Sequence, residues 1–191
     1  MVVTKISKIV ERYNNTYPDR PPLTISYGRI YGVWFLGNDY RNKSSFYGAY
    51  PQQLLKRYKV MFGHRGNILH LFSGQMKRGK YIRFDLKQKA DVQGDAHILR
   101  KYFKKNKFDI IFADPPYSKD DAIKYNTKMI NRYKVVKECY KILKPKGLLV
   151  WLDTMLPMYS KKLFTIVGCI GIIRSTNHRF RLVTIFKKTI L

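Results

Sequence analysis

The chain has 191 residues, and its 38 Lys and Arg residues against 12 Asp and Glu residues give a formal net charge of +26. The 45% hydrophobic and 15% aromatic fractions exclude a basic disordered tail, because such tails lack the residues of a core. The length predicts a single domain that folds without a metal or a disulfide. So large a positive charge predicts a polyanionic partner. Nucleic acid is the first candidate, and the alternatives are that the charge serves only solubility or that the partner is an anionic membrane surface.

The cysteine and histidine residues predict neither disulfide bonds nor a metal site. Cys139 and Cys169 stand alone, and the four histidines are scattered, which predicts no disulfide framework and no metal site. The N-terminus has no signal-peptide core, and the longest apolar run, residues 165–173, is too short to cross a bilayer. The lone thiols favour a reducing, cytoplasmic setting, and the apolar runs predict no membrane span.

The first 62 residues read as a helix, a hairpin and a second helix. Residues 2–17 carry apolar side chains at helical spacing, and the following proline-rich stretch ends that helix. In the aromatic-rich stretch 25–50, Gly37-Asn38 predicts a hairpin turn between two short strands. Pro51 is expected to open a helix that continues to about Phe62.

After Gly66, continuous apolar runs alternate with helical patterns, which predicts an α/β fold with a mostly parallel sheet. Two final runs, 164–173 and 180–186, have a short connection and predict an antiparallel C-terminal strand pair. The remaining expected strands are 68–72, 81–86, 90–96, 108–113 and 148–152, and the expected helices are 97–105 and one long helix from the Ser118 cap to about residue 143.

The four residues Asp114-Pro115-Pro116-Tyr117 follow directly on the strand expected at 108–113. Each proline fixes its own φ and restricts the residue before it to extended geometry, so the segment is stiff. It presents one carboxylate, free carbonyl groups and one aromatic ring at the end of a buried strand, where α/β sheets bind their ligands. The alternative is an ordinary turn that closes the strand.

Together with Phe112 and Ala113, these residues resemble the catalytic motif of S-adenosylmethionine-dependent amino-methyltransferases, above all the adenine-N6 DNA methyltransferases. The resemblance covers about residues 45–190 and implies a Rossmann-like methyltransferase sheet. It also implies that Asp114, Pro115, Pro116 and Tyr117 are catalytic. The carboxylate and the Pro115 carbonyl would accept the two N–H groups of the target amine, and Tyr117 would stack on a flipped-out base.

The same resemblance implies the binding residues of the cofactor S-adenosylmethionine. The strand end at 69–74 resembles the first cofactor motif, the next strand ends in an acid for the ribose, and residues 94–96 resemble the adenine-binding segment. An aromatic segment before the second helix resembles the part that closes over the methionine end. The implied cofactor residues are Tyr47, Tyr50, Pro51, Leu71, Phe72, Ser73, Gly74, Asp85, Asp95, Ala96 and Asp114.

The sequence departs from the family pattern in its connections. The family usually has a glycine where Met76 stands, and the stretches after Gly74 and Asp85 are too short for a crossover helix. We therefore expect trimmed first crossovers, and Asp85 is alternatively a plain turn acid. One domain, 1–191, is expected, in which residues 1–62 or a second subunit of a homodimer cover the exposed face of a catalytic core at 63–191.

Two basic segments are candidates for contacts with nucleic acid. The loop before the last strand contributes Arg174, Asn177, His178 and Arg179, with His178 alternatively a plain loop residue. The long expected helix carries a lysine face, which is alternatively only solvated. That face consists of Lys124, Lys128, Lys134, Lys137 and Lys141.

The resemblance implies an enzyme that methylates adenine N6 in DNA, and the compact size and the Lys-rich and Tyr-rich composition suit a phage or mobile-element enzyme. The sequence contains no large insert for target recognition, so the recognition sequence is expected to be short or relaxed, or to be recognised by a partner or a second subunit. Two alternatives remain: an RNA methyltransferase acting on guanine N2 of ribosomal RNA or on adenine N6, and a basic nucleic-acid-binding module with a degenerate methyltransferase fold.

Overall fold

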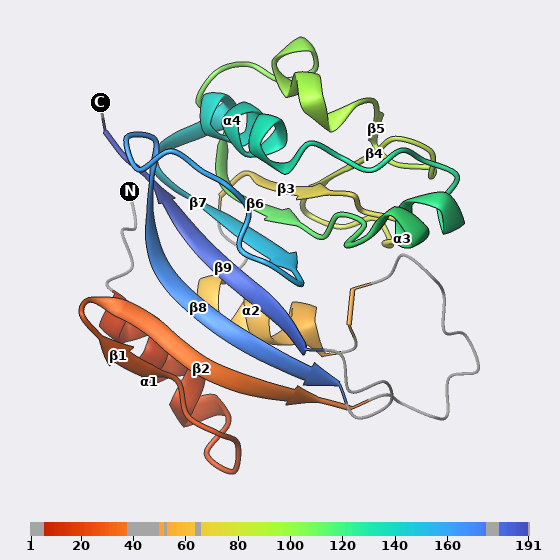
Figure 1. Cartoon of the computed structure of the whole chain (residues 1–191). Helices are drawn as coiled ribbons and strands as arrows, with labels where there is room; N and C mark the ends of the chain where they lie inside the picture. The colour runs from red at the N-terminus through yellow and green to blue at the C-terminus, as the bar shows by residue number, and fades with distance from the viewer. Residues whose placement is uncertain (1–5, 38–49, 52, 64–65, 175–179, 191) are drawn as a thin grey trace.

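One nine-stranded sheet runs through the described part of the molecule, with helices on both of its faces (Figure 1). The structure is a computed structural model and describes residues 6–37, 50–51, 53–63, 66–174 and 180–190. The strands are β1 (Thr24–Ser26), β2 (Arg29–Leu36), β3 (Ile68–Leu71), β4 (Ile82–Asp85), β5 (Val92–Gln93), β6 (Phe108–Ala113), β7 (Leu143–Asp153), β8 (Phe164–Arg174) and β9 (Phe180–Lys188). The helices are α1 (Ile6–Thr16), α2 (Leu54–Phe62), the 3₁₀ helix η1 (Ala96–Lys101), α3 (Lys119–Lys124) and α4 (Arg132–Ile142).

The strand order is β1-β2-β8-β9-β7-β6-β3-β4-β5. Strand β9 is antiparallel to both β7 and β8, β1 is antiparallel to β2, and all other pairs are parallel. The predicted mostly parallel sheet with an antiparallel C-terminal pair is confirmed. Strand β9 lies between β7 and β8, and β2 and β1 extend the sheet beyond β8.

The first two crossovers are short, as predicted. The described connections from β3 to β4 and from β4 to β5 contain turns and no helix. In the second of them, Asp91 accepts hydrogen bonds from the Arg83 backbone at 3.0 Å and from its guanidinium at 2.9 and 3.1 Å. These bonds from Arg83 lower the pKa of Asp91 to about 2. The ion pair thus stabilises a turn where a longer chain would have a helix.

Helices α1 and α2 cover one face of the sheet, and η1 and α4 cover the other (Figure 1). On the first face, Tyr58 of α2 stacks on Phe112 of β6 with ring centroids 4.8 Å apart, and Tyr13 of α1 stacks on Trp34 of β2 at 5.7 Å. The strand β2 extends the sheet by pairing in parallel with β8. The N-terminal segment therefore shares the core of the sheet.

A buried arginine sits among the aromatic residues of this layer. Arg57 of α2 is 3% exposed, and its guanidinium carbon lies 5.7, 5.0 and 5.4 Å from the ring centroids of Tyr13, Tyr17 and Trp34. It also donates a hydrogen bond to the Tyr13 hydroxyl. Contacts of a cation with aromatic faces stabilise a desolvated guanidinium. Arg57 therefore joins α1, α2 and β2.

A hairpin turns at Tyr27-Gly28, where both residues have positive φ (46° and 69°) as a tight turn requires, and β2 continues to Leu36. The predicted turn at Gly37-Asn38 includes Asn38, which lies outside the described residues. One other local prediction was wrong. The long helix is two helices, because Asn126 adopts a left-handed φ of 54° and Asn131 caps a new helix by accepting from the Lys134 N–H. The predicted Ser118 cap is confirmed, since its side chain accepts from the Asp121 N–H.

Removing the Met61 side chain tests the packing of α2 on the sheet. Met61 is fully buried, so we expect Met61→Ala to lower the free energy of unfolding by roughly 2–5 kcal/mol in urea denaturation. Lys56→Ala, on the exposed side of the same helix, is the control and should change it by less than about 0.5 kcal/mol. Equal effects of the two substitutions would contradict the packing described for α2.

Candidate functional site

The parallel strands bring four acidic residues to one edge of the sheet. Asp85 ends β4, Asp95 follows β5, Asp114 follows β6 and Asp153 ends β7. All these strands run in the same direction, so their carboxyl ends lie along the same edge. Ligands of open α/β sheets bind outside this edge. In a chain with 12 acidic residues, this concentration of carboxylates marks the edge as the candidate site.

Asp114 and Tyr117 are joined directly. The Tyr117 hydroxyl donates a hydrogen bond of 2.5 Å to Asp114 Oδ1. Burial, and then the negative charge of Asp114, raise the pKa of Tyr117 well above its ordinary value. The hydroxyl therefore keeps its proton and remains a donor to the carboxylate. The two ends of the four-residue motif thus hold each other, and the two prolines between them limit the conformations of the backbone.

Two arginines fix Tyr117 from outside the motif. Arg132 Nη2 donates to the Tyr117 carbonyl at 2.8 Å. Arg181, 8% exposed on β9, places its guanidinium carbon 4.8 Å from the centroid of the Tyr117 ring. The Tyr117 ring also packs against the hydrophobic core on the α1/α2 side of the sheet, so its position is fixed by apolar as well as cationic contacts.

Asp153 anchors this arrangement to the sheet. It is fully buried at the end of β7 and accepts from Arg132 Nε at 2.7 Å and from Arg132 Nη2 at 3.1 Å. The Trp151 indole N–H and the Thr154 backbone N–H also donate to its carboxylate, at 3.1 and 2.8 Å. Neither Asp153 nor Arg132 was predicted from the sequence. An acid at the carboxyl end of a strand, in a chain with so few acids, is the signal that would have found Asp153.

An aromatic cluster lies on the α1/α2 side of Asp114. Burial, and then the charge of Asp114, raise the pKa values of Tyr50 and Tyr58, so both stay protonated. The Tyr50 hydroxyl lies 3.2 Å from Nδ1 of His70, which is 4% exposed and stacks on Phe112 at 4.9 Å. Burial lowers the pKa of His70 to about 4, which keeps the ring neutral.

Around the end of β3, the predicted cofactor segment forms a tight turn. Leu71 is buried in the core, and Phe72 and Gly74 both have positive φ values, 57° and 53°. Between them, Ser73 is buried, and its hydroxyl has no hydrogen-bond partner among the described residues. An unpaired buried hydroxyl is costly, so a polar ligand at this strand end would satisfy it.

Asp85 connects this turn to the one after β4. Its Oδ2 accepts from the Gly74 N–H at 2.9 Å, and its Oδ1 accepts from the Lys87 and Gln88 N–H groups at 2.9 and 3.0 Å. A carboxylate has about four acceptor positions, so three bonds leave room for one more donor. Asp85 therefore stabilises the turns, as expected of a plain turn acid, and it also keeps one acceptor position that a ribose hydroxyl could use.

Asp95 caps η1 and orients His97. It accepts from the His97 backbone N–H at 2.8 Å and lies 2.6 Å from His97 Nδ1, while His97 Nε2 accepts from the Asn131 N–H at 2.9 Å. Since Nε2 accepts, the proton of a neutral ring is on Nδ1. This chain of contacts ties the predicted adenine-binding segment, with buried Ala96, to the start of α4. The sequence analysis did not use His97.

The remaining predicted residues are only partly described. Tyr50 and Pro51 are among the described residues. Tyr47, Asn177, His178 and Arg179 lie outside them. Arg174 ends β8. The expected lysine face is wrong, because Lys124 ends α3 and Lys128 lies in the connection before α4. They therefore do not share a helix face with the lysines of α4.

Within the described ranges, no helix is long and apolar enough to cross a membrane. The described residues also contain no group of three or more His, Cys, Asp or Glu side chains placed to hold a metal ion.

A family model described as "Conserved hypothetical protein 95" matches residues 77–153. The matched stretch runs from the first crossover to the end of β7 and contains all four acids of the candidate site. No curated protein matches the sequence.

Solved structures with similar folds include several methyltransferases. TrmN from Thermus thermophilus is 14% identical, with a TM-score of 0.46, and the match covers 64% of this chain and 44% of that chain. A putative SAM-dependent methyltransferase from Streptococcus mutans is 14% identical, with a TM-score of 0.49 and coverages of 87% and 55%. A putative methyltransferase complexed with SAH is 12% identical, with a TM-score of 0.41 and coverages of 64% and 45%.

The chain spans about half the length of these three structures. Identities this low concern the fold alone. The strand order described above gives this chain its Rossmann-like methyltransferase fold.

Removing the Asp153 carboxylate tests the anchor of the site. We expect Asp153→Ala to lower the free energy of unfolding by about 3–5 kcal/mol, because it leaves a half-buried Arg132 without its partner. Lys144→Ala, in the more exposed pair with Asp109, is the control and should cost about 1 kcal/mol or less. Equal losses, measured by urea denaturation at low salt, would show that Asp153 does not anchor the site.

The lowered pKa of His70 predicts a dependence of stability on pH. The group is harder to protonate in the folded state, so its contribution is complete above pH 6.5 and is lost as pH falls toward 4. The shift from 6.5 to about 4 corresponds to roughly 3 kcal/mol. Urea titrations at pH 7 and pH 4.5 should show a larger loss for the wild type than for His70→Gln. The same loss in both proteins would rule out His70 as the cause.

Proposed function

We propose that the chain transfers a methyl group from S-adenosylmethionine to the exocyclic amine of a nucleic-acid base. The observation that carries the proposal is the Asp114-Pro115-Pro116-Tyr117 segment, which extends from the carboxyl end of β6 and is fixed by the Tyr117 contacts. The fold and the charge of +26 agree with a nucleic-acid methyltransferase.

The chemistry explains why a carboxylate and a rigid backbone are needed. The amine of a base is a poor nucleophile because its lone pair is delocalised into the ring. The Asp114 carboxylate and the Pro115 carbonyl would accept the two N–H groups and let the nitrogen become tetrahedral. Their negative partial charges would also oppose the positive charge that develops on the nitrogen, at no cost of rearrangement. Asp114 needs no tuned pKa for this role.

The Tyr117 contacts supply the necessary rigidity. A hydrogen bond from its hydroxyl orients the Asp114 carboxylate, and the bond from Arg132 to its carbonyl holds the end of the motif. Acceptors that are already oriented act on the transition state more strongly than ones that must first reorganise. The target base must leave its helix to reach them.

The residues at the ends of β3 and β4 fit the cofactor. The orphaned Ser73 hydroxyl and the remaining acceptor position of Asp85 are the groups that would hold it, next to the turn at Gly74. When bound, S-adenosylmethionine supplies a methyl group already activated by its sulfonium charge. Asp95 has two contacts to His97, so its part in cofactor binding would be to position the segment around Ala96.

Adenine N6 in DNA is the first substrate we propose, on the strength of the motif. An exocyclic amine of RNA presents the same two N–H groups to the same acceptors, so guanine N2 or adenine N6 of RNA is the alternative. A binding module without catalysis is the third outcome. The substrate assay below separates the three.

The first experiment is methyl transfer from radiolabelled S-adenosylmethionine to DNA and to RNA, followed by nucleoside analysis. We expect labelled N6-methyladenine in DNA. Label in RNA alone would replace DNA with RNA as the substrate. No label in either, together with no binding of S-adenosylmethionine by calorimetry, would overturn the proposal in favour of the binding module.

Asp114→Ala tests the role of the carboxylate in the active protein. Loss of the Asp114 carboxylate should lower the transfer rate by about 10²-fold or more, as removal of one preorganised group does in other enzymes. The affinity for the cofactor should stay nearly unchanged. Asp120→Ala removes an exposed carboxylate of α3 and is the matched control, with an unchanged rate expected. An active Asp114→Ala protein would show that the site assignment is wrong.

A further inference from the structure

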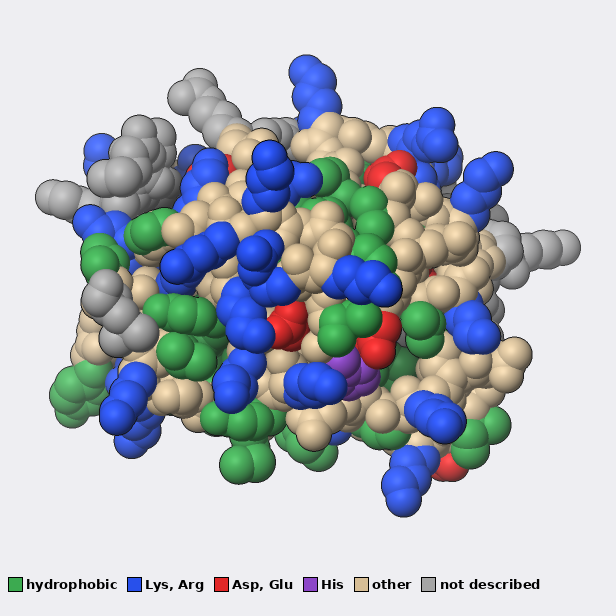
Figure 2. Space-filling view, turned by 90° about the horizontal axis from the view of Figure 1, so that it is seen from above, with side chains coloured by type: hydrophobic (Ala, Val, Ile, Leu, Met, Phe, Trp, Pro, Cys, Tyr) green, Lys and Arg blue, Asp and Glu red, His purple; other side chains and the backbone are tan. Residues whose placement is uncertain are grey.

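A dense group of cations lies on the outer surface of the η1/α4 layer. Figure 2 shows this side of the molecule, with many Lys and Arg side chains and few acidic ones. We call the exposed cations of η1, the turn after it and α4 the basic track. Its residues are Arg100, Lys101, Lys104, Lys105, Lys134, Lys137 and Lys141.

The track begins beside the candidate site. The first residue of α4, Arg132, contacts the Tyr117 carbonyl, and the track lysines of α4 follow within the next turns. Lys134, Lys137 and Lys141 are spaced by three and four residues, which places them along one side of the helix. With a rise of 1.5 Å per residue, they cover about 10 Å. That length corresponds to roughly three phosphates of one strand of a duplex.

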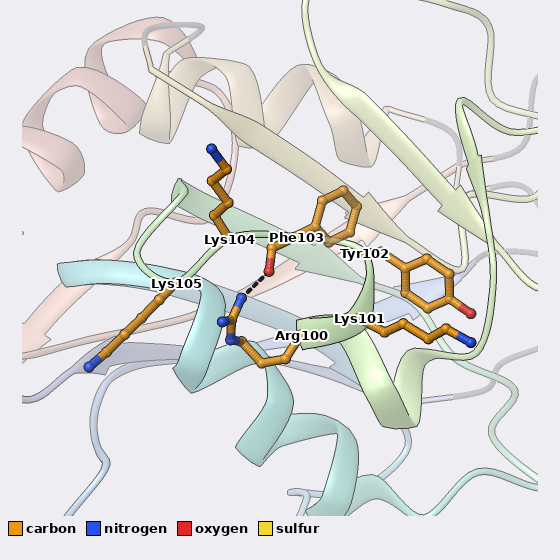
Figure 3. Close-up of a pocket in the computed structure, with 6 residues that line it drawn as sticks. All are labelled: Arg100, Lys101, Tyr102, Phe103, Lys104 and Lys105. Carbon is orange, nitrogen blue, oxygen red and sulfur yellow. Dashed lines mark hydrogen bonds between the residues drawn. The ribbon is translucent and has the colours of Figure 1, made fainter.

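The cations of η1 continue the track. Helix η1 packs against α4, and the Arg100 backbone N–H donates to Glu138 of α4 at 3.0 Å. A hollow of about 230 Å³ lies here, lined by residues 100–105 (Figure 3). In this view, the Arg100 guanidinium donates to the Phe103 carbonyl, while the Lys104 and Lys105 side chains extend away from each other into the surroundings.

The charge of the track is almost uncompensated. Glu138 is the only acid in segments 96–105 and 132–142, and it is 6% exposed. Both of its oxygens are engaged, Oε1 with Lys141 Nζ at 2.5 Å and Oε2 with the Arg100 N–H. Cations packed this closely repel one another, and polyanions relieve the repulsion.

An exposed aromatic ring accompanies the cations. Tyr133, the second residue of α4, is 40% exposed, and Lys137 Nζ lies 5.3 Å from the centroid of its ring. Lysines interleaved with an exposed ring can bind phosphates and stack a base. Phosphodiester backbone is therefore a better match for this surface than an acidic protein.

We propose that the basic track binds the sugar-phosphate backbone of the nucleic-acid substrate beside the target base. This rests on the proposed function for the identity of the target, and it adds that the substrate is a polynucleotide extending several nucleotides from the site over η1 and α4. The binding is to phosphates, so it contributes affinity and orientation and no sequence preference.

The test compares two triple variants of the full chain. Lys101→Gln/Lys134→Gln/Lys137→Gln removes three track cations and keeps the pair of Lys141 with Glu138, and Lys8→Gln/Lys56→Gln/Lys59→Gln removes three exposed lysines from α1 and α2 on the opposite side of the sheet. The two proteins have the same net charge. Binding of fluorescent 20-nucleotide DNA and RNA probes, single-stranded and duplex, is measured at several salt concentrations by anisotropy.

Loss of three phosphate contacts should reduce the slope of log K against log salt by about 2 for single strands and about 3 for duplexes. We expect this for the track variant, with at least tenfold weaker binding at about 0.1 M salt, and a much smaller effect for the control. Equal effects in both variants, or no effect of the track variant, would overturn the proposal. Binding to anionic phosphatidylserine vesicles through the track, without binding to the probes, would also overturn it.

These measurements need no methyl transfer, so their outcome is separable from that of the proposed function. A protein that lacks transfer activity and still shows the track-dependent salt slope would support phosphate binding by the basic track and refute the proposed methyl transfer. An active enzyme whose binding is insensitive to the track substitutions would support the proposed methyl transfer and refute phosphate binding by the track.

Discussion

The buried contact between Arg132 and Asp153 is the interaction on which the site depends. A single guanidinium pairs with the carboxylate at the end of β7 and also donates to the carbonyl of Tyr117. Arg132, the first residue of α4, therefore joins the end of β7 to Tyr117, the last residue of the motif that contains Asp114. A buried ion pair gains little net stability compared with apolar packing, so its value here is the defined geometry that it imposes on neighbouring residues.

Two unlike layers support that geometry. On one face, aromatic residues of α1 and α2 pack on the sheet, and the hydroxyl groups of Tyr50 and Tyr58 keep their protons because burial and then the charge of Asp114 raise their pKa values. On the other face, α4 and η1 present lysines to solvent and are joined to the site by the contact of His97 with Asn131. Both layers therefore contribute to the site, and we propose that the outer surface of the η1/α4 layer contacts the substrate backbone.

The sequence predicted the parts of this structure that depend on local patterns. Apolar strands, their order in the α/β alternation and the short crossovers followed from spacing, and β6 was predicted to the residue. It did not predict the break between α3 and α4, which depends on the left-handed conformation of one residue, Asn126. The pair of Arg132 with Asp153 joins residues 21 positions apart, and helical or strand periodicity contains no information about such contacts.

A structure of the protein with S-adenosylhomocysteine and a substrate oligonucleotide tests the proposed role of Asp114 most directly. We expect the target base to be flipped out of its helix. Its exocyclic nitrogen should lie within about 3.2 Å of both the Asp114 carboxylate and the Pro115 carbonyl. A base bound elsewhere on the sheet edge, or an exocyclic nitrogen without contact to Asp114, would contradict the proposed role.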